Sequence, residues 1–326
     1  MEADTLAKRV IRSKTFPLLV VLIIVLIIFT SIRTDFITSV DNLRGILNAM
    51  SLTGTLAVGV ACLLISGGMD LSVGATGMFG GIMVAFFIQW GMPWVVALIL
   101  AVLVGAVIGA FNAFLINVMH FMGFIATLGV ASLLQGLGNV FTTAKNVAVN
   151  NASFFKLGSA SIFSLFSVPF LIMLALMIIY GLILARTRFG RTMYMCGGNR
   201  LAAQMCGLKP NRVRTILHIN CSALAALGGA ILTARVRSGS PLAVIGQEFD
   251  AITASVLGGV AFMGGSGGMG GCFIGLLLLT CFTNGLTFIG LGAYWKIIAQ
   301  GALLIAALAV DYINQNSLNK RMKSNA

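Results

Sequence analysis

The sequence is poor in charged residues, and above all in acidic ones. Only 8 of its 326 residues are Asp or Glu, and charged residues make up 9% of the chain, whereas soluble domains carry about 25%. Hydrophobic residues make up 59%, and they form runs that are too long for the strands of a membrane barrel. The composition excludes a soluble globular protein and predicts a polytopic membrane protein built from helices.

Side chains that carry out catalysis or bind metals are also scarce. The two histidines, His120 and His218, stand apart in the sequence, and no HExxH, GxSxG or paired-carboxylate cluster occurs. The 6 cysteines include no CxxC spacing, and none falls in a loop that we place on the outer side of the membrane. We therefore expect no catalytic site, no metal site and no disulfide. The histidines are expected at the membrane interface and the cysteines as small packing residues.

Signatures of nucleotide binding are missing as well. No Gly-x-x-x-x-Gly-Lys-Ser/Thr segment occurs. Gly265-x-Gly267-x-x-Gly270 has the spacing of a dinucleotide-binding loop, but no acid follows it before Asp311 and no βαβ pattern surrounds it. We expect a tight cytoplasmic turn there, and we expect the chain to bind no cofactor of its own.

What the chain does contain is a series of apolar runs of about 17 to 25 residues, the length of membrane-spanning helices. The first run has no Ala-x-Ala-type cleavage site after it, so we expect a permanent anchor. The run 250–263 is short and rich in glycine, which is also compatible with a half-helix or a re-entrant segment. The sequence predicts one all-α transmembrane domain over residues 1–326 with ten spans: 16–32, 46–65, 71–90, 93–118, 122–142, 163–185, 213–235, 250–263, 269–289 and 295–313.

Glycines four residues apart within these runs predict close packing of helices. The pairs are Gly77 and Gly81, Gly105 and Gly109, and Gly271 and Gly275.

Basic residues predict the orientation of the helices. With ten spans and a cytoplasmic N-terminus, the cytoplasmic segments hold twice as many Lys and Arg residues as the outer ones. This is the bias that retains basic segments inside during insertion. We therefore expect both termini in the cytoplasm. The net charge of +13 does not indicate nucleic-acid binding, because the basic residues cluster at the ends of apolar runs.

One long polar interval, residues 186–214, interrupts the apolar runs. It carries seven basic residues and no acid, so we place it in the cytoplasm. Within it, Asn199 to Cys206 is expected to form a short helix, with Asn199 as N-cap and Gly207 and then Pro210 after its end. The small residues Ala202 and Ala203 would offer a close-packing surface to another protein. The alternative is an ordinary basic loop.

A second interval, Ile65–Gly74 (ISGGMDLSVG), places Asp70 between two apolar runs. An acid near membrane depth is costly and usually has a partner or a role. Gly67 and Gly68 would break the helix, and Ser72 could satisfy some of the freed backbone groups. Asp70 either lies in a broken helix near a transport path or caps the next helix at the cytoplasmic face. We favour capping.

Uncharged polar residues lie within the predicted spans. Amides there suit hydrogen bonds between helices, and they also suit a neutral, hydroxyl-bearing solute that crosses the membrane. The scarcity of ionisable side chains argues against a path for ions. Outer polar stretches at 143–162 and 235–250 would form either docking surfaces for a soluble partner or solvated connections. The candidates for the translocation path are Asp70, Ser72, Asn112, Asn139 and Asn284.

Four stretches together resemble the ribose-type sugar permeases of ATP-binding-cassette importers. They are residues 65–74, 188–208, 246–271 and 284–311. They follow the order of the family, and the resemblance covers nearly the whole chain. The departures are small: Cys196, Cys206 and Phe249 stand where the family tends to have other residues.

The resemblance implies a subunit of the bacterial cytoplasmic (inner) membrane that imports a pentose, a hexose or a similar neutral solute. Its implied partners are a second permease, identical or different, a cytoplasmic ATPase that carries the ATP and Mg²⁺, and a periplasmic or lipoprotein sugar-binding protein. An ion-coupled secondary transporter is the alternative, with Asp70 as its one ionisable candidate along the path. The resemblance assigns the helix that couples to the ATPase to Gly197, Gly198, Asn199, Arg200, Ala203 and Gly207.

Overall fold

The computed structural model describes residues 16–162 and 165–324. The basic N-terminal residues Lys8, Arg9, Arg12 and Lys14, which we expect in the cytoplasm, lie outside these ranges. The helices are α2 (Phe16–Ile32), α3 (Asp35–Thr38), α4 (Val40–Ile65), α5 (Val73–Gln89), α6 (Trp94–Asn117), α7 (Gly123–Thr142), α8 (Ala152–Ser159), α9 (Val168–Arg186), α10 (Arg188–Gly198), α11 (Arg200–Met205), α12 (Pro210–Val236), α13 (Gln247–Leu257), α14 (Met269–Phe288) and α15 (Ala293–Ser324). The strands are β1 (Val147–Ala148), β2 (Ser161–Ile162), β3 (Phe166–Ser167) and β4 (Ser238–Gly239).

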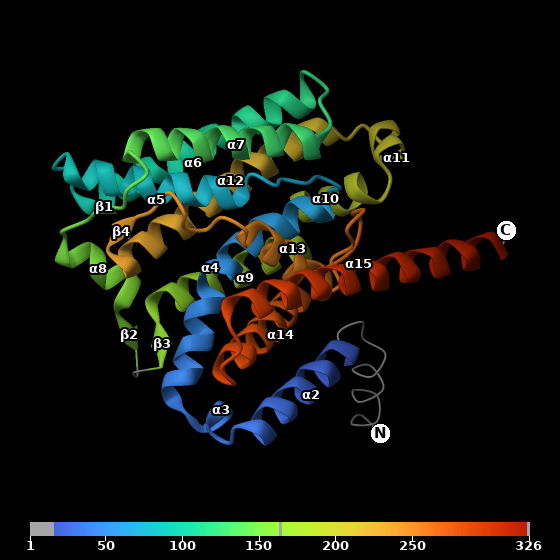
Figure 1. The fold of residues 1–326 in the computed structure, drawn as a ribbon. Coiled ribbons are helices and arrows are strands. Elements are labelled where there is room, and N and C mark those ends of the chain that lie inside the picture. The colour runs from blue at the N-terminus through green and yellow to red at the C-terminus, as the bar shows by residue number, and fades with distance from the viewer. Residues whose placement is uncertain (1–15, 163–164, 325–326) are drawn as a thin grey trace.

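Helices α4 and α12 form the centre of the molecule. α12 packs against α4, α5 and α6, and α4 also packs against α9, α13 and α14. Figure 1 shows α5, α6, α7 and α12 stacked on one side of α4, with α2, α14 and α15 on the other. The strand pair β1–β4 and α8 lie at one end of the molecule, and α10 and α11 lie at the opposite end.

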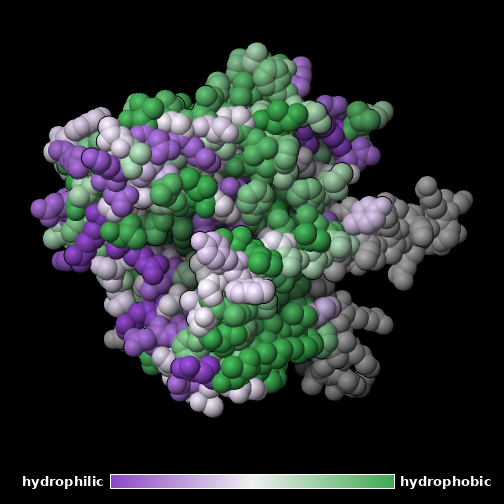
Figure 2. Space-filling model, viewed as in Figure 1, coloured by the Kyte–Doolittle hydropathy of each residue, from purple (hydrophilic) through white to green (hydrophobic). Residues whose placement is uncertain are grey.

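Large apolar side chains are exposed along the outer faces of α6, α7 and α9. Hydrophobic residues dominate the surface over the helices, whereas hydrophilic residues gather over the β1–β4 end and around α11 (Figure 2). An apolar band between two polar ends is the surface expected of a protein that lies across a bilayer.

Within residues 16–162 and 165–324, six helices have the length and composition to cross a membrane: α4, α6, α7, α9, α12 and α14. Three apolar helices are shorter, at Phe16–Ile32, Val73–Gln89 and Tyr294–Ala309. The structure therefore confirms a polytopic helical protein, while the count of ten spans and the cytoplasmic side of the termini stay predictions.

The run 250–263 does not form a helix that could span the membrane by itself. α13 has 11 residues, which is about 16 Å of helix, and the apolar core of a bilayer is about 30 Å thick. The chain leaves the helix at Gly258 and turns at Gly259, whose φ is +83°. The half-helix alternative is the one that the structure contains.

The predicted close packing through glycines is present. A Cβ atom on Gly109 of α6 would lie 2.4 Å from the carbonyl oxygen of His218, and one on Gly105 would lie 2.6 Å from that of Ser222. A Cβ on Gly229 would lie 1.7 Å from the carbonyl oxygen of Gly77. The backbones of α5, α6 and α12 can approach this closely because these positions carry no side chain.

α5 begins at buried residues inside the protein, and α13 begins at half-buried ones. The non-helical residues 66–72 precede α5, and residues 240–246 precede α13. The two starts are adjacent, since a Cβ on Gly74 would overlap the carboxylate of Glu248. Irregular backbone at this depth is tolerated where protein, not lipid, surrounds it.

Candidate functional site

The predicted short helix in the basic interval is present as α11. The side chain of Asn199 accepts the N–H of Ala202 at 3.0 Å, as an N-cap does. Gly207 follows the helix with a φ of +78°, and the N–H of Leu208 donates to the carbonyl oxygen of Ala203 at 3.0 Å. Asn199 and Gly207, from which the helix was predicted, thus lie at its beginning and just after its end.

The outward face of α11 agrees with the predicted one only in part: Ala202 is exposed, but Ala203 is not. Ala203 is only 2% exposed and packs within the chain, so the prediction that it meets another protein is wrong. Leu201 and Met205 are 72% and 90% exposed. They are four residues apart and therefore lie on one face of the helix. Both apolar residues are evident in the sequence of the basic loop, but we assigned the contact with another protein to the small residues beside them.

Glycines from three separate segments meet behind α11, and we call this cluster the glycine junction: Gly67, Gly197, Gly264 and Gly265. The N–H of Gly265 donates to the carbonyl oxygen of Ile65 at 2.9 Å. A Cβ on Gly197 would lie 1.9 Å from that same oxygen. Gly67, Gly264 and Gly265 all have φ between +72° and +93°, which disfavours any other residue there. The expected tight turn in the glycine-rich segment is confirmed, although its contact with the basic interval was not foreseen.

Gly198 differs from its neighbour in the glycine junction. Its Cβ would meet nothing nearer than Gly265 Cα at 3.9 Å. Of the two glycines that we assigned to the coupling helix, Gly197 is therefore needed for packing and Gly198 is open to the surface.

Two side chains hold the glycine junction together. The hydroxyl of Tyr194 donates to the carbonyl oxygen of Gly267 at 2.8 Å, and the guanidinium of Arg214 donates to that of Gly67 at 2.8 Å. Burial raises the pKa of the Tyr194 phenol, which keeps the donor protonated. Burial also raises the pKa of the Cys196 thiol beside it, which leaves that cysteine unreactive.

Asp70 lies in a buried polar cluster with Ser72, Asn112 and His218. Its Oδ1 accepts the backbone N–H of Ser72 at 2.8 Å and the Ser72 hydroxyl at 2.6 Å. Its Oδ2 accepts the amide of Asn112 at 3.3 Å and lies 3.6 Å from His218 Nδ1. The Asn112 amide also donates to Ser72 Oγ at 2.8 Å.

This geometry corrects two predictions. Asp70 does not cap α5, because it bonds to Ser72, the residue before the helix, and to no N–H of the first turn. His218 was expected at the membrane interface and alone, yet it is 1% exposed and faces Asp70. The sequence could not bring them together, since 148 positions separate them and the close approach of α6 and α12 decides the contact.

The remaining path candidates lie elsewhere. Asn139 is on an exposed face of α7 and donates to the carbonyl oxygen of Gln135 at 2.9 Å. Asn284 of α14 is half-buried and lies near Gly45 of α4. Asp70, Ser72 and Asn112 are thus brought together, whereas Asn139 and Asn284 are separate from them, and a role in the path stays a prediction for all five.

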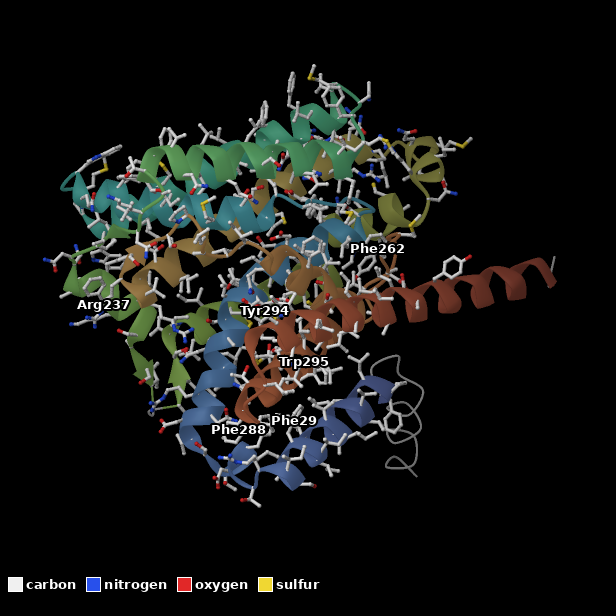
Figure 3. The ribbon with its side chains drawn as sticks, viewed as in Figure 1. Phe29, Arg237, Phe262, Phe288, Tyr294 and Trp295 are labelled. Carbon is white, nitrogen blue, oxygen red and sulfur yellow. The ribbon has the colours of Figure 1, made fainter. Side chains whose placement is uncertain are left out.

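The two outer polar stretches partly form one surface. β1 pairs with β4 in antiparallel register, Val147 opposite Gly239. The guanidinium of Arg237 lies 4.9 Å from the ring centroid of Phe155 on α8. Figure 3 shows Arg237 at the end of the molecule opposite Phe262, which precedes α14. Residues 240–250 are mixed: Val244 and Asp250 are buried, whereas Leu242, Ile245 and Phe249 are exposed. A docking surface and a solvated connection both stay predictions for this stretch.

Comparisons with known proteins bear directly on this arrangement. The sequence pattern of a family described as the permease component of branched-chain amino acid transport systems matches residues 42–308. The chain belongs to this permease family. No solved structure matches it.

Curated relatives of the permease cover nearly the whole of both chains. It is 32% identical over 304 residues to the ribose import permease protein RbsC of Haemophilus influenzae, covering 92% of this chain and 94% of that one. It is 33% identical to the Escherichia coli K12 protein of the same name, covering 90% and 92%. The D-allose transport system permease protein AlsC of that strain is 32% identical, with 89% of each chain covered. With its apolar helices, the permease is a multi-pass protein of the bacterial inner membrane.

Proposed function

We propose that this permease is the membrane subunit of an ATP-binding-cassette importer that carries a monosaccharide into the cytoplasm. The observation that supports it most is the full-length similarity to permeases named for ribose, D-allose and L-arabinose. The family description refers to branched-chain amino acids, but these full-length relatives are named for sugars. Amides and hydroxyls dominate the polar side chains in the apolar helices, which fits a neutral polyol.

α11 is the element that docks on the ATPase in this proposal. Leu201 and Met205 supply the exposed apolar contact, and the basic residue Arg200 lies beside them. Asn199 and Gly207 shape the helix, while Gly197 and Ala203 seat it on the chain and Gly198 stays at the surface. ATP and Mg²⁺ belong to the ATPase, and the permease holds no cofactor of its own.

The opposite end of the molecule receives the sugar-binding protein, periplasmic or lipid-anchored. The paired strands β1 and β4, with Arg237 over Phe155, give that end a defined shape rather than a loose loop. A second permease, identical or different, completes the path, and Asp70, Ser72, Asn112, Asn139 and Asn284 remain its candidates. Ten spans with both termini in the cytoplasm suit this arrangement, because the basic α10–α11 interval then also lies inside.

The ion-coupled alternative is not favoured by the comparisons. The side-chain contacts of Asp70 also argue against it, since Ser72 donates to its Oδ1 and Asn112 donates to its Oδ2.

Uptake by reconstituted vesicles tests the proposal. Vesicles that contain the permease, its ATPase and its binding protein should accumulate labelled D-ribose, D-allose or L-arabinose when ATP is supplied, and should not accumulate labelled leucine. Replacing both Leu201 and Met205 by Asp should release the ATPase, whereas replacing the exposed Leu242, which follows β4 outside the apolar helices, by Asp as a surface control should not. Sugar accumulation by the permease alone on an ion gradient would refute the proposal.

A further inference from the structure

The interval 66–72 between α4 and α5 is bound by elements that are distant in the sequence. Its first N–H groups, those of Ser66, Gly67 and Gly68, donate to the last turn of α4, and distant elements bind other groups of its backbone. The carbonyl oxygen of Gly67 accepts from Arg214 of α12 at 2.8 Å. The N–H of Leu71 donates to the hydroxyl of Thr127 on α7 at 3.1 Å. The interval is therefore fixed relative to the surrounding helices.

α12 holds the interval at two points. Arg214 bonds to Gly67, and His218 lies 3.6 Å from the carboxylate of Asp70. Arg214 and His218 are four residues apart and thus lie on one face of the helix. Asn112 of α6 and Ser72 fix the carboxylate from the other side. A displacement of the interval must carry α12 with it or leave buried polar groups unpaired, which is costly.

The interval also connects the two ends of the molecule. At Gly67 it enters the glycine junction, where Gly197 at the end of α10 and Gly265 pack against the last residue of α4. α12 then continues for 27 residues, about 40 Å of helix, and ends two residues before β4. Contacts thus run from the end of α10, which leads into α11, through the interval and along α12 to the opposite strand pair, beside the direct contact of α11 with α12.

We propose that the interval 66–72 transmits movement of α11 to α12. Asp70 and His218 are positioning residues that keep the interval aligned with α12. This inference rests on the proposed docking of the ATPase at α11. It assigns the buried Asp70 to coupling rather than to contact with the sugar.

The test compares Asp70→Asn and His218→Gln with the control Asn117→Ala in the assembled importer in vesicles. Asn117 of α6 also bonds to α12, but it does so away from the interval. It donates to the hydroxyl of Thr215 at 3.0 Å and to the backbone of Asn211. The quantity measured is sugar transported per ATP hydrolysed. Networks of this kind change coupling about 2- to 30-fold, and we expect each of the two variants to lower the ratio within that range while Asn117→Ala leaves it unchanged.

The double variant sharpens the test. If Asp70 and His218 act through each other, Asp70→Asn with His218→Gln should lower the ratio little more than either alone. Effects that multiply would overturn the proposal, and so would a ratio equal to that of Asn117→Ala. Failure of both single variants to assemble, when the control assembles, would show that the cluster serves folding and would also overturn it.

Co-purification of the ATPase distinguishes failure of the proposed transmission through the interval from failure of the proposed docking at α11. Asp70→Asn and His218→Gln should retain the ATPase, because neither residue is at the surface. If the ATPase stays bound after Leu201 and Met205 are both changed to Asp, docking at α11 is refuted. If it is lost there but the two buried variants transport with the normal ratio, only the transmission is refuted.

Discussion

Replacing Gly197 by Ala should destabilise the permease much more than the same change at the adjacent Gly198. A Cβ on Gly197 would lie 1.9 Å from the carbonyl oxygen of Ile65 and 2.7 Å from the backbone nitrogen of Gly265. Both atoms belong to backbone, and they are joined by the 2.9 Å hydrogen bond of the glycine junction. Neither can rotate away, so the segments must separate.

The magnitude follows from two costs. Overpacking of a dense site costs about 1–3 kcal/mol, and a weakened backbone hydrogen bond adds about 0.5–1.5 kcal/mol. We therefore expect Gly197→Ala to lower the free energy of unfolding by about 2–4 kcal/mol. Gly198→Ala meets its nearest atom at 3.9 Å, an ordinary contact, and should leave stability within about 1 kcal/mol of the wild type.

Thermal unfolding in detergent, followed by tryptophan fluorescence, measures the difference. Since 1 kcal/mol corresponds to about 2–4 °C for chains of 150–250 residues, Gly197→Ala should lower the melting temperature by several degrees and Gly198→Ala should barely move it. Equal melting temperatures for the two variants would refute the packing argument, and a larger loss at Gly198 would reverse it.

Three further predictions concern the two ends of the molecule. Asn199→Ala removes the N-cap of α11 and should weaken ATPase binding by about 0.5–2 kcal/mol, measured by titration of the ATPase; affinity equal to the wild type would mean that the cap does not order the docking helix. Changing Leu201 and Met205 singly to Ser should lower ATPase affinity without lowering the melting temperature, because both side chains are exposed; a drop in melting temperature would show that they pack within the permease. At the other end, a double-mutant cycle of Arg237→Ala and Phe155→Ala should give a coupling of about 0.5–1 kcal/mol in affinity for the binding protein, and no coupling would mean that the cation–π contact does not shape that surface.

Local sequence signals predicted the local structure well. The N-cap Asn199, the stop at Gly207 and the glycine pairs of α5 and α6 act as their chemistry indicates. These features depend on residues within a few positions of one another, or on the size of a single side chain. They can therefore be derived without knowing the fold.

Features that depend on distant contacts were missed. Asp70 has the side chain of a cap, but the N-cap position of α5 is Ser72, two residues further on, and His218 approaches Asp70 from another helix. Ala203 has the size of a contact residue, yet the fold turns it inward. The glycine junction joins residues near positions 67, 197 and 264, and no periodicity in the chain relates these segments.

The uninterrupted course of α12 restricts how the chain can change in length. One residue inserted between His218 and Val236 would turn the distal part of the helix by about 100° and advance it by about 1.5 Å. The face that meets α5 and α6 would then point elsewhere, and the glycine contacts along it would be lost. Within 143–162 only the short connections around β1 and α8 are free of this constraint, because α8 packs on α12, where a Cβ on Gly158 would lie 2.3 Å from the backbone nitrogen of Arg235. Insertions and deletions among relatives should therefore gather in those connections and spare residues 214–236, so that a fixed number of residues separates the two ends of the molecule.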